Sequence, residues 1–485
     1  MFRKTSKNGL WRLKAGLIVP LAAFIAAGFT FVGRYWESDR QYHLVGAVLS
    51  FAAAVSVGYC VLSRNRSVIF RAYAVLLSAI VSSFLLESLL CFTELPLNPE
   101  EIRMRRAAAL GVPFDTRRRV DVARENRRSG ECWYVSLGPV HFLDGQLLEV
   151  DEKRVLPFTN VPMCNNVLGN ESGVFTTFRS DEHGFNGPTG LWSQPDVIQT
   201  AFLGDSFTIG AYVPSGESFV DQVRDSYPRT VNLAAVGSGP LCQLGAMREY
   251  LSGRRVQTVF WVYFEGNDLW DLERDRRQTI LLQYLRNPTF SQGLANLQPS
   301  LGEALRKYIE AEETKHAETE LSSESDWLQF IGSHLRLANC RTVVQRLVSQ
   351  LLADKRPRFD LRLFERILVA ARDQTVHNEG RLVFIYLPEF SRLSRAPQPR
   401  ASARDDRGRV LGLVAALGIE CIDLAPVFES LDKPTDMFPF GVSGHYTSDG
   451  NTLIAQAILQ FLASSTALGN DGRPHPITSE TRSGN

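Results

Sequence analysis

The chain has 485 residues, and its 53 lysines and arginines against 52 aspartates and glutamates leave a formal net charge of +1. A charge this close to zero provides no positive field for a polyanion, which argues against a DNA- or RNA-binding protein. With 44% apolar residues the chain can bury a sizeable core. At roughly 100 to 200 residues per domain, its length accommodates two to four domains. A wholly disordered protein is excluded as well.

Three long apolar runs lie within the first 92 residues. Residues 15–32 and 44–62 carry no charged side chain, and residues 72–92 carry one, Glu87. Each run is about as long as an α-helix must be to cross the hydrocarbon core of a bilayer. We therefore predict that residues 1–92 form a transmembrane region with about three helices.

The charges between these runs predict the orientation of the chain in the membrane. Basic residues precede the first run and separate the second run from the third: Arg3, Lys4, Lys7, Arg12, Lys14, Arg64, Arg66 and Arg71. Because positively charged loops stay in the cytoplasm, we expect a multi-pass protein of the cell (inner) membrane whose chain is periplasmic after Phe92. Alternatively, the residues before Gly28 form a signal peptide, since a basic start precedes an apolar core.

The seven cysteines do not follow a metal-binding spacing, because the sequence has no C-x-x-C motif. Outside the apolar runs, Cys132 and Cys164 are the closest pair in the sequence. An oxidising compartment would permit a disulfide between them. That these are ordinary buried cysteines is an equally open alternative.

The remaining chain divides by composition. Residues 93–130 contain nine arginines and are predicted to be a basic juxtamembrane linker, either touching anionic headgroups or simply solvated. Residues 131–195 have short apolar runs between Gly, Asn and Pro, which predicts a strand- and turn-rich segment leading into the next domain. Residues 466–485 are rich in polar and small residues and are predicted to be a disordered tail.

Residues 196–465 alternate buried-strand runs with amphipathic helical patterns. The strand runs are residues 197–203, 230–234, 256–264, 382–387 and 419–424, and the helical patterns are residues 217–227, 241–251, 361–371, 410–417 and 449–462. This alternation predicts a doubly wound parallel α/β sheet. Charged helical sequence over about residues 272–360 interrupts it. We expect an insertion there beside the sheet, serving as a lid, a partner surface or a solvated helical face.

Residues able to carry acyl-transfer chemistry follow the predicted strands, where ligands bind in an open parallel sheet. Ser206 follows the first strand at a turn, which would expose its hydroxyl as a nucleophile. Gly237 and Asn267 follow the next two strands, and His445 precedes the last helix. The backbone N–H groups of Ser206 and Gly237 and the amide of Asn267 could form an oxyanion hole. His445 would be the general base.

Four blocks of this sequence resemble those of the SGNH (GDSL-like) hydrolase superfamily. They are FLGDSFT at residues 202–208, NLAAVGSGP at 232–240, FEGND at 264–268, and His445 followed by Gly450 and Asn451. The DEHGFN sequence at residues 181–186 also resembles a segment that precedes the first block in membrane-attached bacterial members. The resemblance extends over about residues 175–465.

This resemblance implies a flavodoxin-like α/β/α fold. It also implies that Ser206 is the nucleophile and His445 the base, with Ser206, Gly237 and Asn267 as the oxyanion hole. No cofactor and no metal are implied. The family usually carries an acid three, or in some branches two, residues before the histidine, where this chain has Val442 and Ser443. We therefore expect a Ser–His dyad, with a backbone carbonyl orienting the imidazole ring.

Three aspartates are alternatives for the missing acid, and they are Asp423, Asp436 and Asp449. The function expected from these features is an esterase that cleaves an acyl or acetyl ester on a small molecule or a cell-surface glycan through an acyl-enzyme. One alternative is an O-acyltransferase that uses the same site. Another is a catalytically inactive binding or scaffold module of an envelope export machine, which the missing acid would explain.

Overall fold

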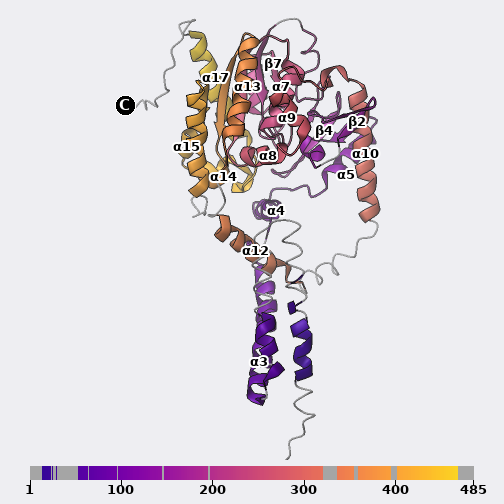
Figure 1. Cartoon of the computed structure of the whole chain (residues 1–485). Coiled ribbons are helices and arrows are strands. Elements are labelled where there is room, and N and C mark those ends of the chain that lie inside the picture. The colour runs from indigo at the N-terminus through magenta and orange to yellow at the C-terminus, as the bar shows by residue number, and fades with distance from the viewer. Residues whose placement is uncertain are drawn as a thin grey trace, which may run out of the picture. The chain divides into compact units, whose positions relative to one another are not determined.

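The computed structural model describes residues 14–22, 24–25, 29, 53–59, 61–63, 65–95, 97–144, 147–194, 197–320, 336–353, 359–394 and 401–467. The chain divides into two compact units, each described by itself (Figure 1). One unit combines Met1–Asn98 with Ser323–Pro357, and the other combines Pro99–Ser322 with Arg358–Asn485.

The first unit contains the apolar helix α3 (Arg66–Leu90). Its N-cap residue is Asn65, whose side chain accepts the Ser67 N–H at 2.9 Å. Its segment Ser67–Leu90 is long and apolar enough to cross a membrane. It contains most of the predicted span at residues 72–92. The predicted spans at residues 15–32 and 44–62 lie partly outside the described residues, and their described residues are helical.

The amphipathic helix α12 (Ala338–Ala353) packs against α3 in this unit. The fully buried carboxylate of Glu87 on α3 accepts the backbone N–H groups of Asn339 and Cys340, each at 2.9 Å. These are N–H groups of the first turn of α12, which have no acceptor within the helix and attract a negative charge. The predicted insertion at about residues 272–360 is therefore divided, because Ser323–Pro357 belongs to this unit and not to the sheet.

The second unit is built on a parallel sheet of five strands, as the sequence predicts. The strands are β6 (Ile198–Leu203), β7 (Thr230–Asn232), β8 (Val256–Phe264), β9 (Arg381–Leu387) and β10 (Glu420–Asp423), in the order β10-β9-β8-β6-β7. All four pairings are parallel. The carboxyl ends of β7, β6 and β8 are therefore neighbours at one edge.

Helices cover both faces of this sheet (Figure 1). Phe260 and Val262 of β8 pack with α6 (Phe219–Ser226) and α17 (Ser448–Ala467), whereas Trp261 and Tyr263 belong to the core on the other face. That second core includes α7 (Pro240–Leu251), α13 (Arg362–His377) and α15 (Ala401–Ala416). Strands buried on both faces explain the continuous apolar runs in the sequence.

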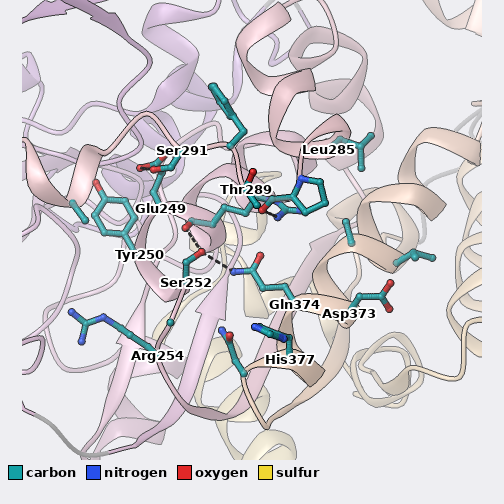
Figure 2. A pocket seen from close by; sticks show the side chains of 18 of the residues that line it. Glu249, Tyr250, Ser252, Arg254, Leu285, Thr289, Ser291, Asp373, Gln374 and His377 are labelled. Carbon is teal, nitrogen blue, oxygen red and sulfur yellow. Dashed lines mark hydrogen bonds between the residues drawn. The ribbon is translucent and has the colours of Figure 1, made fainter.

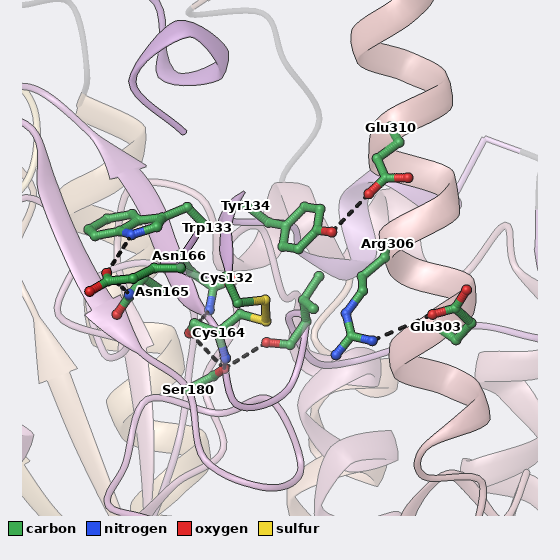
Figure 3. Close-up of a disulfide and its surroundings, with 12 residues drawn as sticks. Cys132, Trp133, Tyr134, Cys164, Asn165, Asn166, Ser180, Glu303, Arg306 and Glu310 are labelled. Atoms are coloured by element: carbon green, nitrogen blue, oxygen red, sulfur yellow. Dashed lines mark hydrogen bonds and ion pairs between the residues drawn. A yellow bond between two sulfur atoms is a disulfide. The ribbon is translucent and has the colours of Figure 1, made fainter. Parts of the chain in front are cut away.

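Residues 131–195 form short strands against this domain. One sheet has three strands, β1 (Trp133–Val135), β4 (Asn165–Gly169) and β5 (Thr176–Arg179). In it β4 pairs with β1 in parallel and with β5 antiparallel. A second, antiparallel pair consists of β2 (Leu148–Val150) and β3 (Lys153–Val155). A disulfide joins Cys132 to Cys164, at the starts of β1 and β4 (Figure 3). Of the two alternatives for these cysteines, the structure has the disulfide.

The first half of the predicted insertion packs on the second unit. Helix α9 (Thr279–Arg286) contacts α7 and α13, and α10 (Ser300–Glu320) contacts β1 and β2. Tyr134 of β1 donates its hydroxyl hydrogen bond to Glu310 of α10 at 2.8 Å (Figure 3). These contacts attach α9 and α10 to the second unit.

The arginine-rich residues 93–130 differ from a simple linker. They contain α4 (Pro99–Ala109) and α5 (Arg119–Arg127), both in the second unit. Arg106 donates hydrogen bonds to the carbonyls of Phe440 and Gly441 at 3.0 and 3.1 Å, and Arg127 pairs with Glu313 at 2.7 Å. Arg106 and Arg127 therefore hydrogen-bond or pair within the domain, while Arg105, Arg117 and Arg118 are exposed.

Shorter elements complete the second unit. They are η1 (Pro139–Phe142), α8 (Asp268–Asp275), η2 (Leu294–Asn296), α14 (Phe390–Leu393), α16 (Ala425–Glu429), η3 (Pro434–Met437) and η4 (Pro439–Gly441). Helix α17 ends at Ala467. The rest of the predicted tail at residues 466–485 lies outside the described residues.

Candidate active site

Ser206 lies in a tight turn directly after β6. The backbone N–H groups of Thr208 and Ile209 donate to the Asp205 carbonyl at 3.2 and 3.0 Å, which closes the turn. The neighbouring residues Asp205 and Phe207 are buried, whereas Ser206 is half-buried. The turn therefore leaves the serine in contact with solvent at the carboxyl edge of the sheet.

Asp205 connects this turn to Asn267 through hydrogen bonds of its side chain. Its carboxylate accepts the Phe207 N–H at 2.9 Å and an N–H of the Asn267 side chain at 2.8 Å. Burial raises the pKa of Asp205, and the two hydrogen bonds offset part of that rise. Asp205 thus connects the turn after β6 with the residue that follows β8.

The loop after β7 is tied to the same turn through Asn232. The Asn232 side chain donates to the Thr208 carbonyl at 2.9 Å and accepts the Ala234 N–H at 3.1 Å. Further along the loop, Gly237 has a φ of +66°, which disfavours a side chain, and a Cβ there would lie 2.9 Å from Val140. Glycine therefore allows the backbone of this loop to approach η1 closely.

Asn267 is the N-cap residue of α8 and follows β8 after a short turn. One N–H of its side-chain amide donates to Asp205, and its Oδ1 is buried without a partner among the described residues. Ser206, Gly237 and Asn267 thus follow three adjacent strands, β6, β7 and β8, at the same edge of the sheet.

His445 lies in the loop before α17 and contacts both Ser206 and a carboxylate. Its Nε2 is 2.7 Å from Ser206 Oγ, and its Nδ1 is 3.2 Å from Glu171 Oε1. The other Glu171 oxygen accepts the His445 backbone N–H at 2.8 Å. The three side chains therefore form a serine–histidine–carboxylate chain of hydrogen bonds.

The imidazole ring is also held by aromatic contacts. The ring centroids of Phe207 and Tyr212 each lie 4.4 Å from that of His445. Since Phe207 is the residue after Ser206, one short turn places both the hydroxyl and an aromatic ring against the histidine. These contacts restrict the rotation of the imidazole ring.

Glu171 is buried in the turn between β4 and β5. Burial raises its pKa, but the charge and hydrogen bonds of His445 and the charge of Arg103 outweigh that effect, so the pKa of Glu171 is lowered from its usual value. Glu171 is thus ionised at neutral pH and can only accept. His445 Nδ1 must then carry the proton, which leaves Nε2 of the neutral ring free to accept the Ser206 hydroxyl hydrogen.

Arg103 of α4 joins the acid to the histidine loop. Its buried guanidinium pairs with Glu171 at 3.3 Å and donates to the Ser443 carbonyl at 2.5 Å. A Cβ at Gly444 would clash with both Arg103 and Glu171. The glycine before His445 therefore permits the close approach of these two charged side chains.

The structure differs from the sequence prediction at the third member of the site. We predicted a dyad oriented by a backbone carbonyl, but the ring Nδ1 faces Glu171. Of the three aspartates considered, Asp423 pairs with Arg407, and none has a contact with His445 among the described residues. Local spacing could not reveal Glu171, because it lies 274 positions before the histidine.

A metal centre is not indicated in the described parts of the chain, where no group of three or more His, Cys, Asp and Glu side chains could hold an ion. The candidate site itself contains a hydroxyl, an imidazole and a carboxylate. The comparisons with known proteins add no assignment. The chain matches no protein-family model. No curated protein matches it either.

Proposed function

We propose that the chain is a membrane-anchored serine esterase of the SGNH type that uses Ser206, His445 and Glu171 as its catalytic triad. The observation that carries this proposal is the hydrogen-bonded chain from Ser206 Oγ through both ring nitrogens of His445 to Glu171, with steps of 2.7 and 3.2 Å. A hydroxyl, a base and an orienting acid at hydrogen-bond distance are the parts of a nucleophilic acyl-transfer site.

In the proposed reaction, His445 Nε2 takes the Ser206 proton as Oγ attacks the ester carbonyl. The resulting imidazolium lies beside ionised Glu171, which stabilises its positive charge. His445 then gives the proton to the leaving alcohol, and Ser206 keeps the acyl group. His445 then takes a proton from a water molecule as that water attacks the acyl-enzyme, and the imidazolium gives this proton to Ser206 Oγ as the acyl–oxygen bond breaks and the carboxylic acid leaves.

The tetrahedral intermediate carries a negative oxygen that needs hydrogen-bond donors. Ser206 and Gly237 support this role because neither backbone N–H donates a hydrogen bond to the residues that the structure describes. The Asn267 amide has a second N–H beyond the one that Asp205 accepts. Asp205 thereby orients the amide as a third candidate donor.

Two further features support the family. When the five strands are numbered in chain order, the spatial order β7-β6-β8-β9-β10 is 2-1-3-4-5, the order of flavodoxin-like sheets. The candidate residues lie in the sequence blocks that resemble the SGNH superfamily. Glu171 departs from the usual pattern, since the proposed acid comes from the β4–β5 turn and not from the histidine loop.

Three observations support the proposed compartment. The helix α3 is apolar enough to span a membrane, the basic residues favour a cytoplasmic N-terminus, and the Cys132–Cys164 disulfide is typical of an oxidising compartment. We propose a multi-pass inner-membrane protein with a periplasmic catalytic domain. An acyl or acetyl ester on a cell-surface glycan is a substrate that this location makes available.

The test uses the full chain purified in detergent and a fluorophosphonate probe, which labels activated serines. We expect labelling of the wild type and none of Ser206→Ala or His445→Ala. Ser448→Ala is the matched control, because this serine lies three residues after His445 in the same region, and it should label like the wild type. Equal labelling of Ser206→Ala would overturn the proposal, and an unlabelled wild type would favour the inactive scaffold module.

A second assay separates a hydrolase from an acyltransferase that shares the site. The full chain is given a small acetyl ester with and without an added oligosaccharide, and free acetate and acetylated sugar are both measured. A hydrolase releases acetate at the same rate in both reactions. Acetyl transfer to the sugar at the expense of acetate would instead assign the chain to the O-acyltransferases.

A further inference from the structure

A cavity of about 1340 Å³ lies at the end of the sheet opposite Ser206. Two of its lining residues, Arg254 and Asn378, lie in the loops just before β8 and β9, at the amino ends of these strands. The end of α7, the loop after α9 and one side of α13 supply the other walls (Figure 2). The cavity is therefore separate from the candidate active site, which lies at the carboxyl ends.

Arg248 lines this cavity and has an uncompensated charge. Only 8% of the residue is exposed. The one hydrogen bond of its side chain to a described residue goes to the Pro288 carbonyl at 2.5 Å, and its Nε has no partner there. No carboxylate pairs with it among the described residues. A buried charge without a counter-charge is costly to fold, so an anion in the cavity would stabilise it.

The neighbouring Glu249 does not supply that counter-charge. Its carboxylate accepts hydrogen bonds from the Ser291 hydroxyl at 2.9 Å and from the backbone N–H groups of Gln292 and Leu294 at 2.5 and 2.8 Å. It also accepts the Tyr284 hydroxyl at 2.5 Å. Glu249 is thus engaged with the loop after α9.

Two further arginines line the cavity without a carboxylate partner in the described parts of the chain, Arg254 and Arg366. Arg254 stacks over the Trp192 ring at 5.3 Å and donates to the Trp192 carbonyl at 3.0 Å, which holds its guanidinium in place. The other acids on the walls are on α13. Asp373 pairs with Arg372 at 2.9 Å, and Glu365 is exposed.

The cavity also offers polar atoms that suit a hydroxylated ligand. Gln374 Oε1 and His183 Nδ1 are buried without partners, and both residues line the cavity. Gln374 Oε1 can only accept a hydrogen bond, as from a hydroxyl group. The indole of Trp192 and the phenol of Tyr250 provide apolar walls beside these atoms.

We propose that this cavity binds an acidic saccharide, whose carboxylate or phosphate pairs with Arg248 and Arg254 and whose hydroxyls reach Gln374. Arginine suits this task because its planar fork binds carboxylate and phosphate groups through two parallel hydrogen bonds. The site is independent of the proposed esterase chemistry, because it shares no residue with Ser206, His445 or Glu171.

The experiment measures binding to the full chain in detergent by isothermal titration calorimetry. The probes are tetragalacturonate for carboxylates, glucose 6-phosphate for a sugar phosphate, inorganic phosphate, and cellotetraose as the neutral sugar. Arg254→Gln is compared with Arg255→Gln, a matched control because Arg255 is exposed, pairs with Glu379 and does not line the cavity. Arg248→Gln is the second cavity variant.

We expect tetragalacturonate or glucose 6-phosphate to bind, and which of the two binds more tightly identifies the anionic group. Loss of one charged hydrogen-bond donor should weaken binding about 10- to 100-fold in Arg254→Gln and Arg248→Gln. Arg255→Gln and Ser206→Ala should bind like the wild type. If Arg248→Gln does not fold, Arg254→Gln decides the result alone.

Three results with the sugars and the variants would overturn the proposal. They are the absence of binding by either charged sugar, equally tight binding of cellotetraose, and equal weakening in Arg254→Gln and Arg255→Gln. Binding of inorganic phosphate as tight as that of the sugars would also contradict it, since the hydroxyl contacts would then contribute nothing. None of these results depends on whether Ser206 is a nucleophile, so the two proposals can fail separately.

Discussion

Glu171 contacts His445 at two points, the ring Nδ1 and the backbone N–H. One carboxylate oxygen therefore fixes the tautomer of the ring while the other holds the loop that carries it. An amide at this position could satisfy only part of this arrangement, because it is neutral and one of its two ends is a donor. The acid thus couples the orientation of the base to the position of its backbone.

From this we predict that Glu171→Gln lowers kcat/KM for a small acetyl ester by roughly 10⁴, as removal of the carboxylate does in a serine triad. The loss comes from the wrong tautomer and an unsupported imidazolium. Ester hydrolysis followed at 405 nm with p-nitrophenyl acetate measures it. Asp436→Asn is the control and should retain wild-type turnover. A Glu171→Gln variant within tenfold of wild type would mean that the site works as a dyad.

Asp275 provides a pH dependence at the residue scale. It is fully buried, accepts the Leu241 and Cys242 N–H groups at 3.2 Å, and burial raises its pKa to about 7. Between the ordinary aspartate pKa of about 3.9 and this raised value, the unfolded chain releases a proton that the folded chain retains. Stability contributed by the protonated carboxyl group is therefore lost as the pH rises through this window.

We predict that Tm falls less between pH 5 and pH 8 in Asp275→Asn than in the wild type. The amide oxygen still accepts both N–H groups but cannot ionise. Differential scanning fluorimetry of the detergent-solubilised chain measures the difference. Asp225→Asn, at an exposed position of α6, should keep the wild-type pH dependence. Identical slopes for Asp275→Asn and wild type would show that the buried carboxyl does not titrate in this range.

At the element scale, α4 reaches the candidate site from outside the sheet. Arg103 binds Glu171 and the Ser443 carbonyl, and Arg106 binds the carbonyls of Phe440 and Gly441. One face of this helix thus holds both the acid and the loop before His445. A fragment that begins after α4 would contain every strand of the sheet but would lack this support.

We predict that Arg103→Ala lowers kcat and shifts the acid limb of the pH profile upward. The Arg103 charge helps to lower the pKa of Glu171, so its removal lets that pKa rise and the carboxylate is lost at a higher pH. Arg103→Lys should be faster than Arg103→Ala, since lysine keeps the positive charge but lacks the planar guanidinium group that contacts both Glu171 and the Ser443 carbonyl. The measurement is kcat/KM against pH.

Arg105→Ala, at an exposed position on the same helix, is the control for helix stability. It should leave both the rate and the acid limb unchanged. If Arg103→Ala lowers the rate but leaves the acid limb in place, Arg103 supports the fold of the loop and not the charge of Glu171.

At the scale of the whole molecule, the proposed orientation requires the catalytic unit and the N-terminus to lie on opposite sides of the membrane. We predict that alkaline phosphatase, which is active only outside the cytoplasm, is active when fused after Gly130 and inactive when fused after Leu62. A reporter active only in the cytoplasm should show the reverse pattern. Cytoplasmic signal after Gly130 would contradict the topology and remove the basis for the periplasmic substrate.

Much of the sheet could be predicted because its strands are buried on both faces. The continuous apolar run at residues 256–264 and β8 (Val256–Phe264) coincide, and the amphipathic pattern at residues 241–251 lies within α7 (Pro240–Leu251). Side-chain periodicity is a local property of the sequence, so it can be recognised without knowledge of the fold. The arginine-rich residues 93–130 lack such periodicity, so the sequence did not predict α4 and α5. The contacts that attach these helices to the domain, such as those of Arg106 and Arg127, are seen only in the tertiary structure.

By itself, the sequence determined which residues follow each strand, and parallel strands then bring Ser206, Gly237 and Asn267 to one edge of the sheet. It also determined the apolar helix α3, because length and composition are enough to recognise a helix that could cross a membrane. Only the tertiary structure decided that Glu171 faces His445, that α4 holds this acid, and that Arg248 and Arg254 share a cavity. Such contacts join residues far apart in the chain, and no local pattern encodes the distance between them.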